Sequence, residues 1–170
     1  MEAEWSINLE AEWGSWHEIE GANFNEGDYF GIYEIQMVNQ VRRPIPISRI
    51  GGIDEEGIIY IGRSGLKRPR TLGMRLHEFQ IGRHSGAKTY ELVSEELERL
   101  KPAYSNHKLQ YRAIHLPVDK VKGGMPEIEF KEGLALGDYF SKCGELPPCN
   151  SNFSWFKSFR GFIQKEQRNK

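Results

Sequence analysis

Residues 29–38 read YFGIYEIQMV and residues 57–62 read GIIYIG. Both segments are rich in β-branched and aromatic side chains, which favours strands. Within the first segment, alternate residues share one face of a strand, and these are Tyr29, Gly31, Tyr33, Ile35 and Met37. Each segment places a tyrosine beside a glycine, so two neighbouring strands would bring the two phenols together. A glycine in a strand also lets another backbone or a ligand approach closely.

The flanking sequence predicts three helices and one more strand. Thr71 is suited to cap a helix, Pro102 ends an amphipathic pattern, and Gly144 with a proline pair ends another. The expected helices span 72–81, 90–100 and 127–142, the third strand spans 108–116, and a loop joins 63 to 73. This order predicts an α+β fold, with a small three-stranded antiparallel or mixed sheet flanked by helices.

Composition indicates a globular chain. The 170 residues are 38% hydrophobic and 12% aromatic, enough for a core, which argues against disorder. No apolar run approaches the roughly 18–20 residues that span a bilayer, and the N-terminus lacks a signal-peptide pattern. Cys143 and Cys149 have no second pair, so neither a disulfide framework nor a zinc site is indicated. We expect a non-secreted, cytoplasmic protein with no membrane association.

Charge is distributed unevenly along the chain. The net charge is -1, yet residues 1–30 hold eight acids and no Lys or Arg, so the rest carries +7. Residues 61–90 hold seven basic residues and one acid. A polyanion responds to the local field and not to the total charge. The candidate DNA-backbone contacts are Arg63, Lys67, Arg68, Arg83 and Lys88; each could equally be part of a solvated face.

This pattern divides the chain into three parts. We expect an acidic, Trp-containing extension at 1–28 that packs against the body. A single domain follows at 29–150. A basic, aromatic tail at 151–170 is expected to pack on the same domain, either gripping DNA or closing the core.

An acid lies on the apolar stripe of the helix expected at 127–142. Glu132 is three or four residues from Ile128, Ala135 and Leu136. A buried carboxylate is costly unless it meets a cation. Glu132 is therefore a candidate metal ligand or a member of an ion pair with an arginine.

Together these residues resemble the GIY-YIG nuclease superfamily. The resemblance lies in GIY at 31–33, YIG at 60–62, a following arginine, and a late helical Glu followed by prolines and Asn150. It covers residues 29–150 and implies a small sheet flanked by helices. It also implies that Tyr33 and Tyr60 are the motif tyrosines, that Glu132 binds the metal, and that Asn150 is the motif asparagine.

The catalytic arginine and the proton-transfer group have alternatives. Arg75 matches the family's helix-borne arginine best, and Arg70 is the second candidate. Many relatives carry a histidine four residues later, where this chain has Phe79. His84, in a basic glycine-bearing segment, or His77 could take that role.

The resemblance implies a phosphodiester hydrolase. An arginine and a divalent cation can stabilise the charge that develops on the phosphate, and one carboxylate plus waters suits Mg²⁺ or Mn²⁺. An unperturbed tyrosine, with a pKa of about 10, is a poor base at neutral pH. Tyr33 would need nearby positive charge or a relay to a histidine.

We expect a Mg²⁺-dependent endodeoxyribonuclease that cuts double-stranded DNA to 5′-phosphate and 3′-hydroxyl ends. The short chain, with insertions at 39–56 and 102–126, favours a stand-alone type II restriction-type enzyme, and it leaves open a homodimer on DNA. The alternatives are a structure-specific repair nuclease and a non-cleaving nucleic-acid-binding protein on the same fold.

Overall fold

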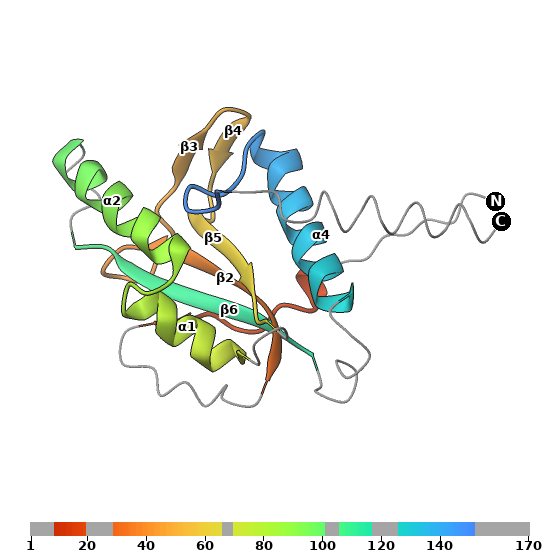
Figure 1. The fold of residues 1–170 in the computed structure, drawn as a ribbon. Coiled ribbons are helices and arrows are strands. Elements are labelled where there is room, and N and C mark those ends of the chain that lie inside the picture. Colours follow the sequence, from red (N-terminus) through yellow and green to blue (C-terminus); the bar gives the residue numbers. More distant parts are fainter. Residues whose placement is uncertain (1–8, 20–28, 66–69, 101–105, 117–125, 152–170) are drawn as a thin grey trace, which may run out of the picture.

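A four-stranded antiparallel sheet forms the centre of the molecule (Figure 1). The computed structural model describes residues 9–19, 29–65, 70–100, 106–116 and 126–151. In spatial order the strands are β1 (His17–Glu18), β6 (Lys108–Leu116), β2 (Phe30–Val38) and β5 (Ile58–Arg63). β2 is central, pairing along its whole length with β6 and on its other side with β5.

Helices cover both faces of this sheet. α1 (Leu72–Gln80) and α2 (Ser85–Leu100) lie on one side, and α4 (Pro126–Cys143) lies on the other (Figure 1). Every residue of β2 is buried as a result. Tyr33 and Ile35 belong to the core beneath α1, while Phe30 and Ile32 belong to the core beneath α4. Alternate residues of β2 therefore point into two different hydrophobic cores, one on each face of the sheet.

The predicted α+β class is confirmed, but the expected three-stranded sheet is wrong. The fourth strand, β1, comes from the acidic N-terminal segment, whose first described residues form the short helix η1 (Leu9–Ala11). The Trp13 and Trp16 rings lie 5.1 and 4.7 Å from the Arg112 guanidinium carbon of β6. The described part of this extension thus packs on the sheet. A two-residue strand carries no periodic signal, so the sequence could not reveal it.

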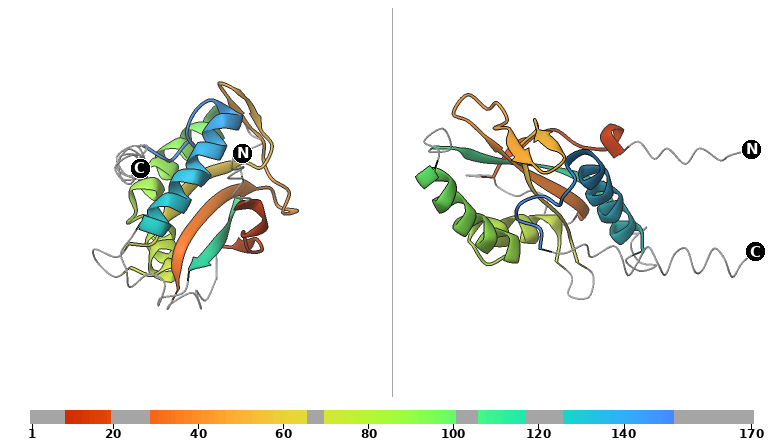
Figure 2. Two further views of the ribbon diagram at one scale, coloured as in Figure 1. Left: turned by 90° about the vertical axis from the view of Figure 1, so that its right-hand side faces the viewer. Right: turned by 90° about the horizontal axis from the view of Figure 1, so that it is seen from above.

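The segment predicted as an insertion at 39–56 contains a hairpin of its own. Its strands are β3 (Ile47–Arg49) and β4 (Gly52–Asp54). Figure 2 shows this hairpin beside the C-terminal end of α4, where the Gly51 N–H donates to the Cys143 carbonyl at 2.8 Å. Cys143 and Cys149 are free and buried.

α2 begins five residues earlier than predicted. The His84 side chain accepts the Gly86 N–H at 3.0 Å, and the His84 carbonyl accepts the Lys88 N–H at 3.1 Å. His84 is thus the N-cap, a position usually held by Ser, Thr, Asp or Asn. Because histidine is not a standard capping residue, sequence rules did not place a helix start here.

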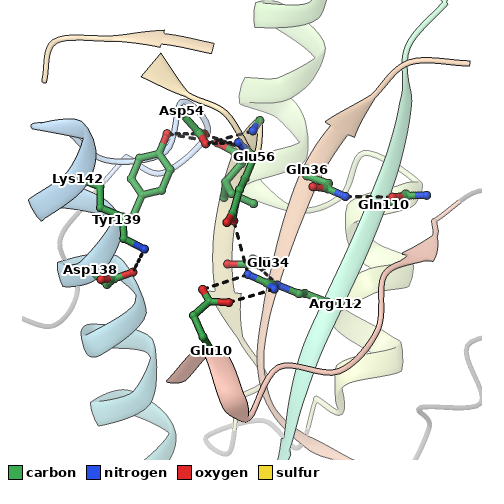
Figure 3. A network of polar contacts seen from close by, with 12 residues as sticks. Glu10, Glu34, Gln36, Asp54, Glu56, Gln110, Arg112, Asp138, Tyr139 and Lys142 are labelled. Carbon is green, nitrogen blue, oxygen red and sulfur yellow. Dashed lines mark hydrogen bonds and ion pairs between the residues drawn. The ribbon is translucent and has the colours of Figure 1, made fainter. Parts of the chain in front are cut away.

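A buried charge cluster ties the central strands to the N-terminal segment (Figure 3). Arg112 lies directly opposite Glu34 in the β2–β6 register and forms an ion pair with it. Glu10 and Glu56 approach the same guanidinium at 3.4 and 3.6 Å. Burial raises the pKa of Glu34 to about 7, and Arg112 opposes that shift.

Among the described residues, no helix is long and apolar enough to cross a membrane.

Candidate functional site

Two tyrosines lie side by side on the face of the sheet that α1 covers. Tyr33 of β2 and Tyr60 of β5 have ring centroids 5.9 Å apart. Gly62 is the residue directly opposite Tyr33 in the strand register. A Cβ atom at Gly62 would lie 2.9 Å from the Tyr33 hydroxyl oxygen and closer still to the Tyr60 ring. The missing side chain of Gly62 therefore leaves the space that the two phenols fill.

Gly31, the first residue of the GIY motif, is needed for a different reason. Its φ of 154° is rarely adopted by other residues, and a Cβ there would collide with the Ile114 carbonyl of β6. The buried Ser64 side chain accepts the Gly31 N–H at 2.8 Å. The same hydroxyl donates to the Gly31 carbonyl at 3.2 Å. These contacts fix the chain at the start of β2, two residues before Tyr33.

Burial keeps both phenols protonated. The Tyr33 side chain is fully buried, and its hydroxyl has no hydrogen-bond partner within the described part of the chain. Burial and then the adjacent Tyr60 raise the pKa of Tyr33 well above its usual value, and Arg75 lowers it in part. Burial likewise raises the pKa of Tyr60 to about 12. Neither tyrosine is a phenolate at neutral pH in this state.

His84 reaches the tyrosine pair from the start of α2. Its Nε2 atom lies 3.4 Å from the Tyr60 hydroxyl and also contacts the Arg75 guanidinium. Burial, followed by Arg75 and Arg70, lowers the pKa of His84 to about 4. An imidazolium would also lose the Gly86 N–H that it accepts, because both ring nitrogens would then be donors. His84 is therefore a neutral group in the site at physiological pH.

Arg75 and Arg70 are distinguished by what they contact. Both donate to one carboxylate oxygen of Glu78, at 2.9 and 3.1 Å respectively. Only Arg75 of this pair also contacts His84, and its charge lowers the pKa of both tyrosines. Arg75 therefore contacts the cluster of tyrosines and histidine directly, whereas Arg70 is linked to it through Glu78.

Phe79, four residues after Arg75, packs against the ring of Tyr60. Its ring centroid lies 5.6 Å from that of Tyr60 and 5.9 Å from that of His84. A Cβ at Gly86 would lie 2.6 Å from the opposite edge of the Tyr60 ring. Phe79 therefore fills space in the core. The imidazole that reaches Tyr60 belongs to His84, the residue before α2.

Glu132 comes from α4 and lies within electrostatic range of the tyrosines. It is 8% exposed, and its charge raises the pKa of both Tyr33 and Tyr60. Its Oε2 atom forms an ion pair with the Arg63 Nε at 3.0 Å. The Arg63 Nη1 lies 2.7 Å from Glu129 Oε1, one helical turn earlier on α4. Arg63, predicted as a DNA-backbone contact, is thus engaged with two carboxylates.

These two carboxylates fit a divalent cation with few protein ligands. Mg²⁺ is commonly held by one or two carboxylates and completed by phosphate oxygens and waters. The buried Glu132 carboxylate needs a neighbouring positive charge. In this structure the Arg63 guanidinium supplies that charge to both Glu132 and Glu129. No group of three or more His, Cys, Asp or Glu side chains suited to a metal occurs among the described residues. The protein part of such a site would therefore be Glu132, alone or with Glu129.

Asn150 has a positioning role. Its side chain accepts the Ile61 N–H at 2.9 Å and donates to the Ile61 carbonyl at 2.7 Å. The preceding Cys149 N–H donates to the Ile59 carbonyl at 2.8 Å. Residues 149–150 therefore extend the hydrogen bonding at the free edge of β5 and hold the strand that carries Tyr60.

The remaining predicted residues do not join this cluster. His77 lies exposed on α1, and Arg83 and Lys88 lie exposed on either side of the α2 start. Lys67 and Arg68 fall outside the described residues, as does the tail from 152 onward.

Sequence reasoning missed three supporting residues. Glu78 holds both candidate arginines, Ser64 fixes Gly31, and Gly86 makes room for Tyr60. The spacing of Arg75 and Glu78, three residues apart on a helix, was the one available signal. Ser64 and Gly86 act through tertiary contacts that no local pattern shows.

Comparison with known proteins adds no relative. No family model, curated protein or solved structure matches this chain. The resemblance to GIY-YIG nucleases therefore rests on the motif residues of the sequence alone.

Proposed function

We propose that this protein is a Mg²⁺-dependent DNA endonuclease of the GIY-YIG type, hydrolysing phosphodiester bonds to 5′-phosphate and 3′-hydroxyl ends. One observation carries the proposal. Tyr33, Tyr60 and Arg75 come from three different elements and meet His84, the residue before α2, in one cluster, with Glu132 in electrostatic range. A purely structural core has no need of an arginine, a neutral histidine and two phenols together.

Each side chain has a chemical role in this proposal. Arg75 stabilises the negative charge that develops on the attacked phosphate. Glu132 would hold the divalent cation, which supplies Lewis-acid stabilisation and a lowered pKa for a bound water. Tyr33 orients the attacking water. For the proton to pass to His84 Nε2 by way of Tyr60, whose hydroxyl lies 3.4 Å away, the neutral ring must carry its own proton on Nδ1, and the contact with the Gly86 N–H is then given up.

Substrate binding would favour this proton path. In the ligand-free chain, Arg75 and Arg70 disfavour a charged His84. A phosphodiester beside these arginines would offset their charge and raise the histidine pKa toward its usual value. The base would then become effective only when DNA is present.

The proposed substrate is double-stranded DNA. Arg83 and Lys88 are exposed beside the cluster and suit phosphate contacts. Within this proposal we favour a restriction-type enzyme acting in the cytoplasm, either as a monomer or as a homodimer on DNA. A structure-specific repair nuclease would use the same chemistry on a different substrate.

A cleavage assay tests the proposal. Supercoiled plasmid and genomic DNA are incubated with the protein and Mg²⁺, with EDTA in a parallel reaction, and the ends are mapped. We expect Mg²⁺-dependent nicking or linearisation and ends that ligase accepts directly. Binding without cleavage under Mg²⁺ and Mn²⁺ would instead support the non-cleaving alternative, which the replacement of the family histidine by Phe79 favours.

A further inference from the structure

The guanidinium of Arg63 occupies the carboxylate that the proposed function assigns to the metal. Arg63 is the last residue of β5 and lies opposite Ile32, so its side chain points toward α4. It contacts Glu132 Oε2 at 3.0 Å and Glu129 Oε1 at 2.7 Å. A divalent cation and a guanidinium cannot share that oxygen without bringing two positive groups together.

The difference in exposure between the Arg63 and Glu132 side chains suggests how this contact is released. Glu132 is 10% exposed at its side chain, whereas Arg63 is 25% exposed. The arginine can therefore reach solvent more readily than the carboxylate can. A guanidinium binds a phosphate with the same planar, two-pronged geometry that it uses for a carboxylate. A DNA phosphate could thus replace the two glutamates as its partner.

We propose that Arg63 is a latch on the metal site. Without DNA it neutralises Glu132 and Glu129 and weakens cation binding. When a phosphodiester arrives, Arg63 transfers to the phosphate and frees Glu132 for the cation. DNA and metal then bind cooperatively, and each must strengthen the other by the same factor. This inference rests on the proposed function, and Arg63 acts in it as a positioning residue.

The latch is tested by metal affinity, which needs no turnover. Mn²⁺ binding is titrated by electron paramagnetic resonance for the wild type and for Arg63→Met, first without DNA and then with a duplex made uncleavable by phosphorothioate linkages. We expect Arg63→Met to bind Mn²⁺ at least tenfold more tightly than wild type without DNA. The gain in affinity on adding the duplex should be smaller in the variant than in the wild type.

A matched control removes an arginine from another ion pair. Arg49 pairs with Glu145 at 3.2 Å, so Arg49→Met loses the same charge elsewhere and should leave Mn²⁺ affinity unchanged. If Arg63→Met fails to fold, Arg63→Lys replaces it, because a single ammonium cannot bridge both carboxylates and should give intermediate affinity. Equal or weaker Mn²⁺ binding by the Arg63 variant would overturn the latch.

A Glu132→Gln variant separates this inference from the proposed function. If Glu132→Gln loses Mn²⁺ binding while the Arg63 variant matches the wild type, the metal assignment stands and only the latch is wrong. If Glu132→Gln binds Mn²⁺ as well as the wild type does, the metal assignment fails, and the latch fails with it.

Discussion

The His84 ring accepts the Gly86 N–H at one nitrogen and lies against Tyr60 and Arg75 at the other. One side chain thus starts a helix and contributes to the tyrosine cluster. An alanine substitution would confound these roles, because losing an N-cap costs about 0.5–2 kcal/mol. Asparagine is a good N-cap that cannot act as a base, so His84→Asn separates the cap from the chemistry.

The first prediction concerns the proton path. Tyr33→Phe and His84→Asn should each lower the single-turnover cleavage rate substantially, while both keep near wild-type thermal stability. If neutral His84 receives the proton, the wild-type single-turnover rate falls as pH drops toward the histidine pKa in the DNA complex, which we expect to lie above its value of about 4 in the free protein. His84→Asn should lose that acidic limb. Wild-type rates and an unchanged pH profile in both variants would exclude this path.

A second prediction separates the two arginines. Arg75→Ala should lower the single-turnover rate by roughly 10²-fold or more, a loss of about 2.7 kcal/mol of transition-state stabilisation. Arg70→Ala, which removes the arginine that contacts Glu78 without contacting His84, should mainly weaken DNA binding and reduce its salt dependence. If Arg70→Ala lost the rate and Arg75→Ala lost only binding, the assignment would be reversed.

At the scale of elements, the N-terminal segment is joined to the sheet through Arg112 of β6 (Figure 3). The guanidinium pairs with the buried Glu34 and stacks on Trp13 and Trp16. Removing one partner of a buried ion pair is far more costly than removing both, because the remaining charge is left uncompensated.

The third prediction follows from this pairing. Arg112→Met should lower the free energy of unfolding, by less than the roughly 3–5 kcal/mol of a fully charged buried pair at pH 7 and by more as pH rises, because Glu34, with a pKa of about 7 beside Arg112, can take up a proton when the arginine is removed. Adding Glu34→Gln to that variant should recover part of the loss. Urea unfolding of the two single variants and the double variant gives the coupling energy. Additive effects would show that the two side chains do not depend on each other.

Elements with long periodic patterns were predictable from sequence. The predicted third strand at 108–116 matches β6, and the helices at 72–81 and 127–142 match α1 and α4 to within a residue at each end. β1 and the early start of α2 were not predictable. β1 exists because a two-residue segment meets the edge of β6, and α2 starts where a histidine side chain finds a backbone N–H.

The residues of the candidate site could be selected from the sequence, but the contacts between them could not be predicted. Tyr33, Tyr60 and Arg75 were selected from short motifs, and the fold brings them together with His84. An ion pair between Glu132 and an arginine was one of the two alternatives predicted for this residue, but the sequence did not identify Arg63 as the arginine. Which arginine meets which glutamate depends on the strand register and helix orientation, neither of which a single segment specifies.

At the scale of the whole molecule, two buried titratable groups give stability opposite pH dependences. The folded-state pKa of His84 is about 4, below its ordinary value of 6.5, because of burial and the arginines. Its contribution is present above pH 6.5 and is lost as pH falls toward 4. The pKa of Glu34 is raised to about 7 by burial. Its contribution is present below its ordinary pKa of 4.5 and is lost as pH rises through 7.

The fourth prediction tests the pH dependence that His84 contributes. Between pH 6.5 and 4.5, His84→Asn should lose less stability than the wild type, by roughly 1–3 kcal/mol. Urea unfolding at several pH values in this window measures the difference. Parallel stability curves for the two proteins would show that His84 titrates normally in the folded state.

The central claim is that the Glu132 carboxylate supports metal-dependent cleavage of DNA, and Glu132→Gln tests it most directly. Glu127→Gln is the matched control, because Glu127 is an exposed acid on the same helix. Both variants and the wild type are compared in single-turnover plasmid cleavage across a Mg²⁺ titration, with DNA binding measured in EDTA. We predict that Glu132→Gln binds DNA nearly as well as the wild type but does not cleave it, while Glu127→Gln cleaves normally. Near wild-type, Mg²⁺-dependent cleavage by Glu132→Gln would contradict the claim.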